Sequence, residues 1–326
     1  MAHSARSVIG TRGSPLALAQ AHETQDRLAA ALGLDLVALP LSVIKTTGDA
    51  IQDRPLSEAG GKGLFTKELE QALLAGQIDF AVHSFKDVPV TMPLVETADL
   101  VMAAVPEREN PFDVLVCEKA RRLGDLPPGA GVGTGSLRRR SQVLAARPDL
   151  VVEGIRGNID TRLRKLREGQ FDAVILAAAG LRRAGLFDAG YMTLLDDPAV
   201  MLPAPGQGAL VLQCRRDDHR TGGLLGALDH PPTAACVAAE RSLVEKLQGD
   251  CHSPIAALAR IKPAEPGGGG EELTLRAAVG ARDGQPPVLR AEATGAAGAA
   301  DDVVAAVFDQ LARGGVRSLL SGGTSG

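Results

Sequence analysis

Residues 78–89 read IDFAVHSFKDVP, and this stretch decides the class of fold. Its first half, 78–83, is a short apolar run typical of a buried strand, and the polar residues 84–89 predict a loop after it. A helical pattern over 64–75 precedes the strand, and Gly76 ends that helix. A helix that leads into a buried strand is typical of an α/β protein, in which helices cover a mostly parallel sheet.

The same alternation continues in both directions from this stretch. On the N-terminal side, a strand at 6–11 is followed by a helix that Ser14 caps, with Pro15 in its first position. On the C-terminal side the alternation restarts after Pro106, which predicts a second α/β body. Further strand-like segments lie at 36–44, 113–117, 131–134, 151–154, 171–177 and 209–214, and further helices are expected from Ser136 and at 161–168.

The last third of the chain has a different pattern. Three strand-like segments follow one another, with an Asp283–Gly284 turn between two of them and helices on either side. This order predicts a small α+β domain with an antiparallel sheet. With chain crossings near Pro106 and Pro203, we expect one α/β domain from 1–106 and 206–227, a second at 107–205, and the α+β domain at 228–326.

The composition of the 326 residues excludes several classes of protein. Hydrophobic residues make up 45% and charged residues 23%, which excludes wholesale disorder. A net charge of −4 and 2% aromatic residues argue against nucleic-acid binding, which favours basic surfaces and stacking platforms. The four cysteines form neither a zinc motif nor a disulfide framework, and no apolar run is long enough to span a membrane. No secretory signal is visible, so a cytoplasmic protein is the simplest interpretation.

Positive charge is concentrated in one part of this acidic chain. From Arg138 to Arg183 there are eleven basic and five acidic residues, so this segment carries +6 and the rest of the chain −10. Nearly all of the bases are arginines, whose planar guanidinium groups bind carboxylates and phosphates through paired hydrogen bonds. The imbalance predicts an anionic ligand.

Several arginines follow predicted strands, where open α/β sheets bind ligands. The segment 133–136, GTGS, adds backbone N–H groups and the hydroxyls of Thr134 and Ser136 at a helix N-terminus. Arg164 and Arg167 are more simply assigned to an exposed helix face. The arginines for which we predict anion binding are Arg12, Arg138, Arg139, Arg156, Arg162 and Arg183.

Three other side chains could carry chemistry, and the sequence leaves their roles open. Asp87 beside Lys86 is either an ordinary turn pair or a catalytic carboxylate held near cations. His83 ends an apolar strand, where a histidine is more often a core residue with a hydrogen-bond partner than a base or a ligand. Cys251, in a loop next to His252, is either an inert thiol or a nucleophile and attachment point.

At these residues the chain resembles the porphobilinogen deaminase family, also called the hydroxymethylbilane synthases. Each shared motif is modest alone, but they all occur in the same order from end to end of the chain. They are GTRGSPLA at 10–17, GGKGLF at 60–65, AVHSFKDVP at 81–89, VGTGSLRR at 132–139, RGN at 156–158, TRL at 161–163, AGL at 179–181, LPAPGQG at 202–208, and Cys251 before Pro254.

The resemblance implies two periplasmic-binding-protein-like α/β domains joined by crossing hinge segments, and a small α+β third domain with an antiparallel sheet. It also implies a dipyrromethane cofactor attached covalently to Cys251. The cofactor and the substrate, porphobilinogen, bear many carboxylates, which would account for an arginine-rich cleft. By matching position, the residues that bind the cofactor and growing chain besides Cys251 would be Arg12, Ser14, Ser84, Lys86, Thr134, Ser136, Arg138, Arg139, Arg156, Arg162, Arg183 and Gln207.

The resemblance assigns the catalytic role to Asp87. This carboxylate would assist the loss of ammonia from porphobilinogen, stabilise the resulting cations and help to remove the pyrrole α-proton after each coupling. Four substrate molecules would add in sequence before water releases the linear hydroxymethylbilane, and no metal is expected. No nucleic acid, membrane or obligate protein partner is expected either, and the enzyme is expected to be a monomer. Glu58, Gly135 and Asp250 depart from the family pattern.

Two other classes of protein share some of these features. A solute-binding protein for a polycarboxylate or phosphate could use the same two-domain clamp, but the missing signal peptide, Asp87 and Cys251 count against it. A phosphate-directed regulator could have a basic cleft, but the scarcity of aromatic residues and the net charge count against it.

Overall fold

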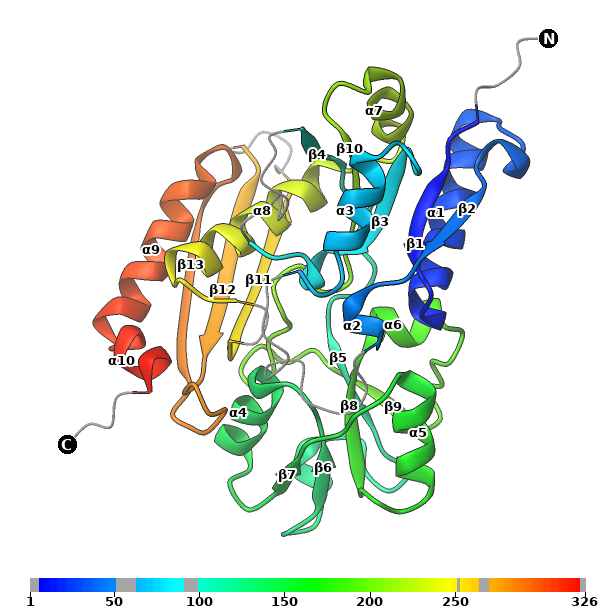
Figure 1. Cartoon of the computed structure of the whole chain (residues 1–326). Helices are drawn as coiled ribbons and strands as arrows, with labels where there is room; N and C mark the ends of the chain where they lie inside the picture. Colours follow the sequence, from blue (N-terminus) through cyan, green and yellow to red (C-terminus); the bar gives the residue numbers. More distant parts are fainter. Residues whose placement is uncertain (1–5, 51–62, 91–98, 251–252, 264–269, 323–326) are drawn as a thin grey trace. The chain divides into compact units, whose positions relative to one another are not determined.

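The computed structural model describes residues 6–50, 63–90, 99–250, 253–263 and 270–322. It divides into two compact units, of which unit 1 is Met1–Glu109 with Gly208–Ala234, and unit 2 is Asn110–Gln207 with Ala235–Gly326. The chain passes from one unit to the other after Glu109, after Gln207 and within helix α8 (Pro231–Lys246). Figure 1 shows the elements of both units.

Unit 1 contains a five-stranded sheet in the order β2-β1-β3-β10-β4. The pairs β1–β2 and β1–β3 are parallel, whereas β10 is antiparallel to both β3 and β4. Its strands are β1 (Ile9–Arg12), β2 (Leu41–Ile44), β3 (Phe80–Ser84), β4 (Leu100–Ala104) and β10 (Leu210–Arg215). Its helices are α1 (Pro15–Leu32), α2 (Thr47–Ala50), α3 (Lys67–Leu74) and α7 (His219–Gly226), with 3-10 turns η1 (Leu36–Ala38) and η2 (Phe85–Asp87).

Strand β3 is buried on both faces of this sheet. Phe80 and Val82 join an apolar cluster with Leu28 of α1, while Ala81, on the other face, joins a cluster with Leu69 of α3. Because successive side chains of a strand point to opposite faces, helices on both sides require a continuous apolar run, which the sequence shows. The chain then leaves the sheet at Ser84 and turns through η2.

Unit 2 contains a second five-stranded sheet, in the order β7-β6-β8-β5-β9. Here β6 is parallel to β7 and β8, and β5 is antiparallel to β8 and β9. Its strands are β5 (Asp113–Val116), β6 (Gly131–Gly133), β7 (Val151–Glu153), β8 (Ala173–Ala177) and β9 (Met192–Leu195). Its helices are α4 (Leu137–Ala146), α5 (Ile159–Arg167) and α6 (Ala178–Arg183), with a 3-10 turn η3 (Leu123–Asp125).

Unit 2 also contains the predicted antiparallel sheet of the C-terminal third. Its order is β11-β12-β13, and helix α9 packs on β12 and β13. The crossing segment before Gly208 is bonded to this sheet, because Ala257 N donates to Pro203 O at 3.1 Å. The elements are β11 (Ile255–Lys262), β12 (Glu272–Val279), β13 (Leu289–Ala296), η4 (Ala297–Ala299), α9 (Ala300–Arg313) and α10 (Val316–Ser321).

The predicted fold class is confirmed: two α/β sheets with covering helices and a small antiparallel sheet. One detail is wrong, since each five-stranded sheet is mixed rather than mostly parallel. A parallel pair needs a crossover connection, but β5 and β10 each follow a passage of the chain from the other unit and run antiparallel to their neighbours. The division into three domains at 106, 205 and 227 stays a prediction. Among the described residues, no helix is long and apolar enough to cross a membrane.

Candidate active site

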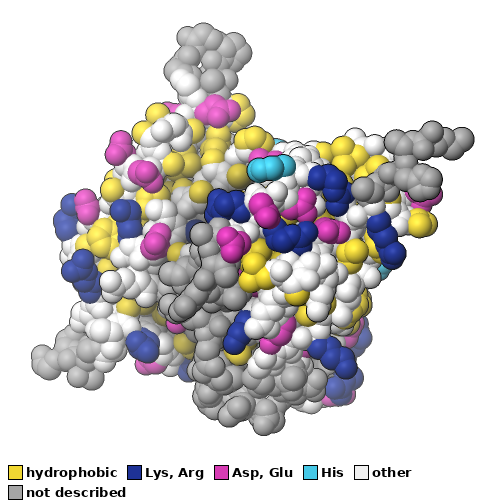
Figure 2. Space-filling model, turned by 45° about the horizontal axis from the view of Figure 1, so that its top comes forward, with side chains coloured by type: hydrophobic (Ala, Val, Ile, Leu, Met, Phe, Trp, Pro, Cys, Tyr) yellow, Lys and Arg dark blue, Asp and Glu magenta, His cyan; other side chains and the backbone are white. Residues whose placement is uncertain are grey.

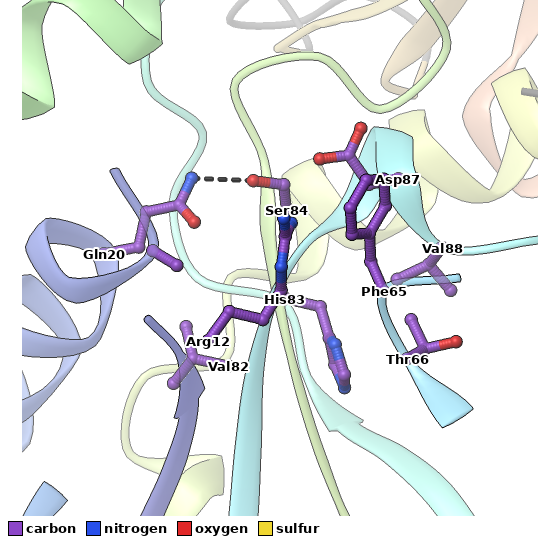
Figure 3. Close-up of a pocket in the computed structure, with 10 residues that line it drawn as sticks. Arg12, Gln20, Phe65, Thr66, Val82, His83, Ser84, Asp87 and Val88 are labelled. Carbon is purple, nitrogen blue, oxygen red and sulfur yellow. Dashed lines mark hydrogen bonds between the residues drawn. The ribbon is translucent and has the colours of Figure 1, made fainter. Parts of the chain in front are cut away.

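A pocket lies in unit 1 where β1 and β3 end. Figure 3 shows the side chains around it. Three predicted site residues, Arg12, Ser84 and Asp87, line this pocket together with His83 and Phe65. The remaining lining residues are Ala17, Gln20, Thr66, Val82 and Val88.

Arg12 is held in the pocket by a carboxylate and an aromatic ring. Its Nε and Nη2 donate to the two carboxylate oxygens of Asp49, and its guanidinium lies 3.8 Å from the centre of the Phe65 ring. Burial raises the pKa of Asp49, but the hydrogen bonds and charge of Arg12, with a bond from Thr46, outweigh it and bring that pKa below its ordinary value. The guanidinium is therefore fixed beside an ionised partner before any ligand binds.

Asp87 lies in the η2 turn that directly follows β3, and it is half-buried. Lys86 lies in the same turn and is also half-buried. Ser84 ends the strand, and its hydroxyl accepts from Gln20 Nε2 on α1 at 2.7 Å. Ser14 caps α1, and its hydroxyl accepts from Ala17 N at 3.3 Å.

His83 is a buried histidine with a hydrogen-bond partner, as the sequence favoured. Its Nε2 lies 2.9 Å from Oε1 of Gln213 on β10. Burial lowers the pKa of His83 to about 4, although the bond with Gln213 opposes the shift, and the charge of Arg12 adds to it. The imidazole is therefore neutral near pH 7.

Unit 2 holds a second group of predicted site residues, gathered on a carboxylate that the sequence did not single out. Asp113, at the start of β5, is fully buried. Arg138 Nη1 lies 2.6 Å from its Oδ2, and Arg139 Nη2 lies 2.8 Å from its Oδ1. Gln207 Nε2 donates to the same Oδ1 at 2.9 Å. Three of the predicted ligand-binding residues thus converge on one acid.

The start of helix α4 brings the two arginines to this acid. Ser136 caps the helix by accepting from Arg139 N at 3.4 Å, and the Thr134 hydroxyl accepts from Ser136 N at 3.2 Å. Burial raises the pKa of Asp113, but the charges and hydrogen bonds of Arg138 and Arg139 bring it well below its ordinary value. One negative charge against two positive ones leaves this buried group with an excess of positive charge.

Arg162 extends the positive region. Its Nε donates to Gly157 O at 2.8 Å, in a turn that needs a glycine because φ at this residue is +106°. Burial first, and then the charges of Arg139 and Arg156, lower the pKa of Arg162 to about 10. Arg156 is exposed and Arg183, in the last turn of α6, is half-buried. Acidic and basic side chains are interspersed on the face drawn in Figure 2, whereas Arg138, Arg139 and Asp113 are buried.

Arg12, Ser84 and Asp87 thus lie together in unit 1, and Arg138, Arg139 and Gln207 lie together in unit 2. Cys251 and Glu58 lie outside the described residues. The sequence reasoning missed Asp49 and Asp113, which hold the arginines. A carboxylate at the head of an apolar strand, as in 113–116, was the available signal for Asp113, because a buried acid needs a partner.

Comparisons with known proteins match both parts of the chain to one family. Residues 7–222 match the family model described as porphobilinogen deaminase, dipyromethane cofactor binding domain, and residues 234–312 match the model of the porphobilinogen deaminase C-terminal domain. A porphobilinogen deaminase of Roseiflexus sp. (strain RS-1) is 45% identical over 97% of this chain and 98% of its own. Those of Nitrobacter winogradskyi and Brevibacillus brevis are each 49% identical over 85% of this chain, covering 84% and 85% of their own.

Proposed function

The chain belongs to the porphobilinogen deaminase family, and from this premise we propose which of its residues carry the reaction. It is a transferase of tetrapyrrole synthesis that makes hydroxymethylbilane with a dipyrromethane cofactor. We propose porphobilinogen as the substrate and Asp87 as the catalytic residue. The observation that carries this proposal is the unit 1 pocket, which Asp87 and Arg12 line together.

The proposed role of Asp87 follows from its surroundings. Porphobilinogen loses ammonia, so the reaction needs a group that delivers a proton to the leaving amine and then faces the cation that remains. A carboxyl group can do both, donating the proton in one state and countering positive charge in the other. Arg12, already fixed by Asp49 and Phe65, would bind a substrate carboxylate beside it.

Arg138, Arg139 and Arg162 of unit 2, which we call the arginine group, fit a polycarboxylate such as dipyrromethane. Arg138 and Arg139 share the single carboxylate of Asp113, and an anionic ligand would compensate the remaining positive charge. Burial is the main cause of the lowered pKa of Arg162, and the charges of Arg139 and Arg156 add to it. When bound, dipyrromethane supplies the primer to which the substrate units are added. We propose that it is attached through the Cys251 sulfur. The residues proposed to hold its carboxylates and those of the growing chain are Arg12, Ser14, Ser84, Lys86, Thr134, Ser136, Arg138, Arg139, Arg156, Arg162, Arg183 and Gln207.

The remaining expectations stay predictions. They are a cytoplasmic location, a monomeric enzyme, and a reaction without nucleic acid, membrane or obligate protein partner. The solute-binding alternative is not favoured, because the family models and the relatives point to an enzyme.

The experiment combines mass spectrometry with turnover. We expect the purified protein to carry the excess mass of a dipyrromethane on the peptide that contains Cys251, and Cys251→Ser to lose both this mass and activity. Asp87→Asn should keep the mass but slow turnover by about 100-fold or more, because the amide can neither donate that proton nor counter the charge. Asp35→Asn, which changes an exposed cap of η1, is the matched control and should keep normal turnover. Near-normal turnover of Asp87→Asn would refute its catalytic role.

A further inference from the structure

Three polar side chains run from the unit 1 pocket into the apolar interior. His83 lines the pocket, and its Nε2 lies 2.9 Å from Gln213 Oε1. Gln213 Nε2 then donates to Oε1 of Glu70 on α3 at 3.1 Å. The exposed fractions are 6% for His83, 2% for Gln213 and 0% for Glu70. We refer to these three residues as the buried relay.

The buried relay has a direction, because the amide of Gln213 has two different ends. Gln213 Nε2 donates to Glu70 Oε1, so the NH₂ end of the amide points to Glu70. The carbonyl end then faces His83, and a carbonyl also accepts. The imidazole can satisfy it only with a hydrogen on Nε2, which leaves the lone pair of the neutral ring on Nδ1.

The strand that carries His83 is held from both faces. His83 lies on the same face of β3 as Ala81, toward α3, and is bonded through Gln213 and Glu70. Ser84, on the opposite face, is bonded to Gln20 of α1, and Figure 3 shows the His83 ring extending away from that bonded pair. The next residues form the η2 turn that ends at Asp87. The two contacts therefore fix the strand end from which the Asp87 turn begins.

We propose that Gln213 and Glu70 are positioning residues, which hold His83 as the neutral Nε2–H tautomer and thereby fix the start of the Asp87 turn. The tautomer of His83 is inferred from the hydrogen bonds of the buried relay alone. The consequence for turnover rests on the proposed function, because it requires Asp87 to act on the substrate. Misplacing a reacting group by about 1 Å is enough to cost about 100-fold in rate, so a shift of this strand end matters.

The tautomer can be read directly by nitrogen NMR of protein labelled with ¹⁵N-histidine. The His83 signals are assigned by their loss in His83→Gln. At pH 7 we expect a protonated, pyrrole-type Nε2 and an unprotonated, pyridine-type Nδ1. The reverse pattern, or signals averaged between the two tautomers, would overturn the proposal. In Glu70→Gln the new amide can accept or donate, so Gln213 is free to turn, and averaged His83 signals are expected. An unchanged pattern in Glu70→Gln would remove Glu70 from the proposal.

The positioning role is tested at Gln213. Gln213→Met keeps a similar volume but removes the acceptor, and we expect kcat to fall by about tenfold or more with the cofactor mass unchanged. Gln213→Glu should restore the Nε2–H pattern and most of the turnover, since a carboxyl oxygen still accepts from His83 and a proton shared with Glu70 replaces the amide N–H.

The matched control is Thr221→Val in the same unit. Its buried hydroxyl donates to Asp218 at 2.8 Å, so the variant loses stability but should keep the His83 pattern and kcat. Normal kcat in Gln213→Met would refute the positioning role and leave the catalytic role of Asp87 to its own test, Asp87→Asn. A fall in kcat that Gln213→Glu does not restore would also refute it.

Discussion

Arg12 shows how a neighbouring acid can prepare a cation for a ligand. Asp49 takes two of its donors and Phe65 covers its plane, so the guanidinium cannot swing freely. The pair is partly accessible, with 20% of the Arg12 side chain and 28% of the Asp49 side chain exposed. Its contribution to stability is therefore small, and its main effect is on geometry.

Replacing Asp49 separates these two effects. We expect Asp49→Asn to lower kcat/KM by about tenfold, because a single amide oxygen no longer fixes both guanidinium donors. The free energy of unfolding should fall by about 1 kcal/mol at most, as for other partly exposed ion pairs. Steady-state kinetics and urea unfolding on the same preparations measure both quantities. A large loss of stability with unchanged kcat/KM would assign Asp49 a structural role instead.

His83 makes the stability of unit 1 depend on pH. Its pKa is about 4 in the folded state and 6.5 ordinarily, so between these values the unfolded chain binds a proton that the folded chain does not. Stability is therefore lost as the pH falls from 6.5 to about 4, by up to about 3 kcal/mol from this residue. Urea unfolding at several pH values should show this part of the slope disappear in His83→Gln. Parallel slopes for both proteins would show that His83 is not buried as a neutral ring.

At the scale of elements, the glycine that ends α1 shows how a local conformation limits the choice of residue. Gly33 has φ of +63°, in the left-handed region, and nothing lies within 4 Å of an added Cβ. We expect Gly33→Ala to lower the free energy of unfolding by about 1 kcal/mol through backbone strain alone. Gly223, within α7, is the matched control, since an added Cβ also meets open space but φ is not positive. Gly223→Ala should stabilise the protein by about 0.5–1 kcal/mol. Equal effects of both substitutions in urea unfolding would contradict this account.

The elements divide into those that the sequence predicts and those that it does not. The helix starts at Ser14 and Ser136 were predicted and are confirmed, because a cap depends on residues within one turn. Strands β4 and β9 were not expected, and neither was the antiparallel direction of β10 and β5. Each of these depends on a partner strand that lies far along the chain, which no local pattern reports.

At the scale of the whole molecule, the candidate site divides in the same way. The rule that ligands bind after the carboxyl ends of strands led to Arg12 and the arginines after β6, whereas the role of Asp87 came from the resemblance to a family. The acids that hold them were missed, since Asp113 is 25 residues from Arg138 and Asp49 is 37 from Arg12. Such pairs form when the sheet closes, and the resemblance to a family named ligand-binding residues without naming what holds them.

Asp113 tests whether the arginine group stabilises unit 2 or only binds ligand. In Asp113→Asn, two buried guanidinium groups would share one neutral acceptor, and an uncompensated buried charge costs about 3–5 kcal/mol. We therefore expect faster hydrogen exchange over β5, β8 and α4, and a loss of cofactor mass, while β1, β3 and α1 of unit 1 exchange at the wild-type rate. Asp149→Asn is the matched control, because Arg147 donates to both oxygens of Asp149 in a similar fork, but at an exposed site of the same unit. It should exchange like the wild type. If Asp113→Asn does the same, the carboxylate does not stabilise unit 2, and its contacts with Arg138, Arg139 and Gln207 serve the ligand alone.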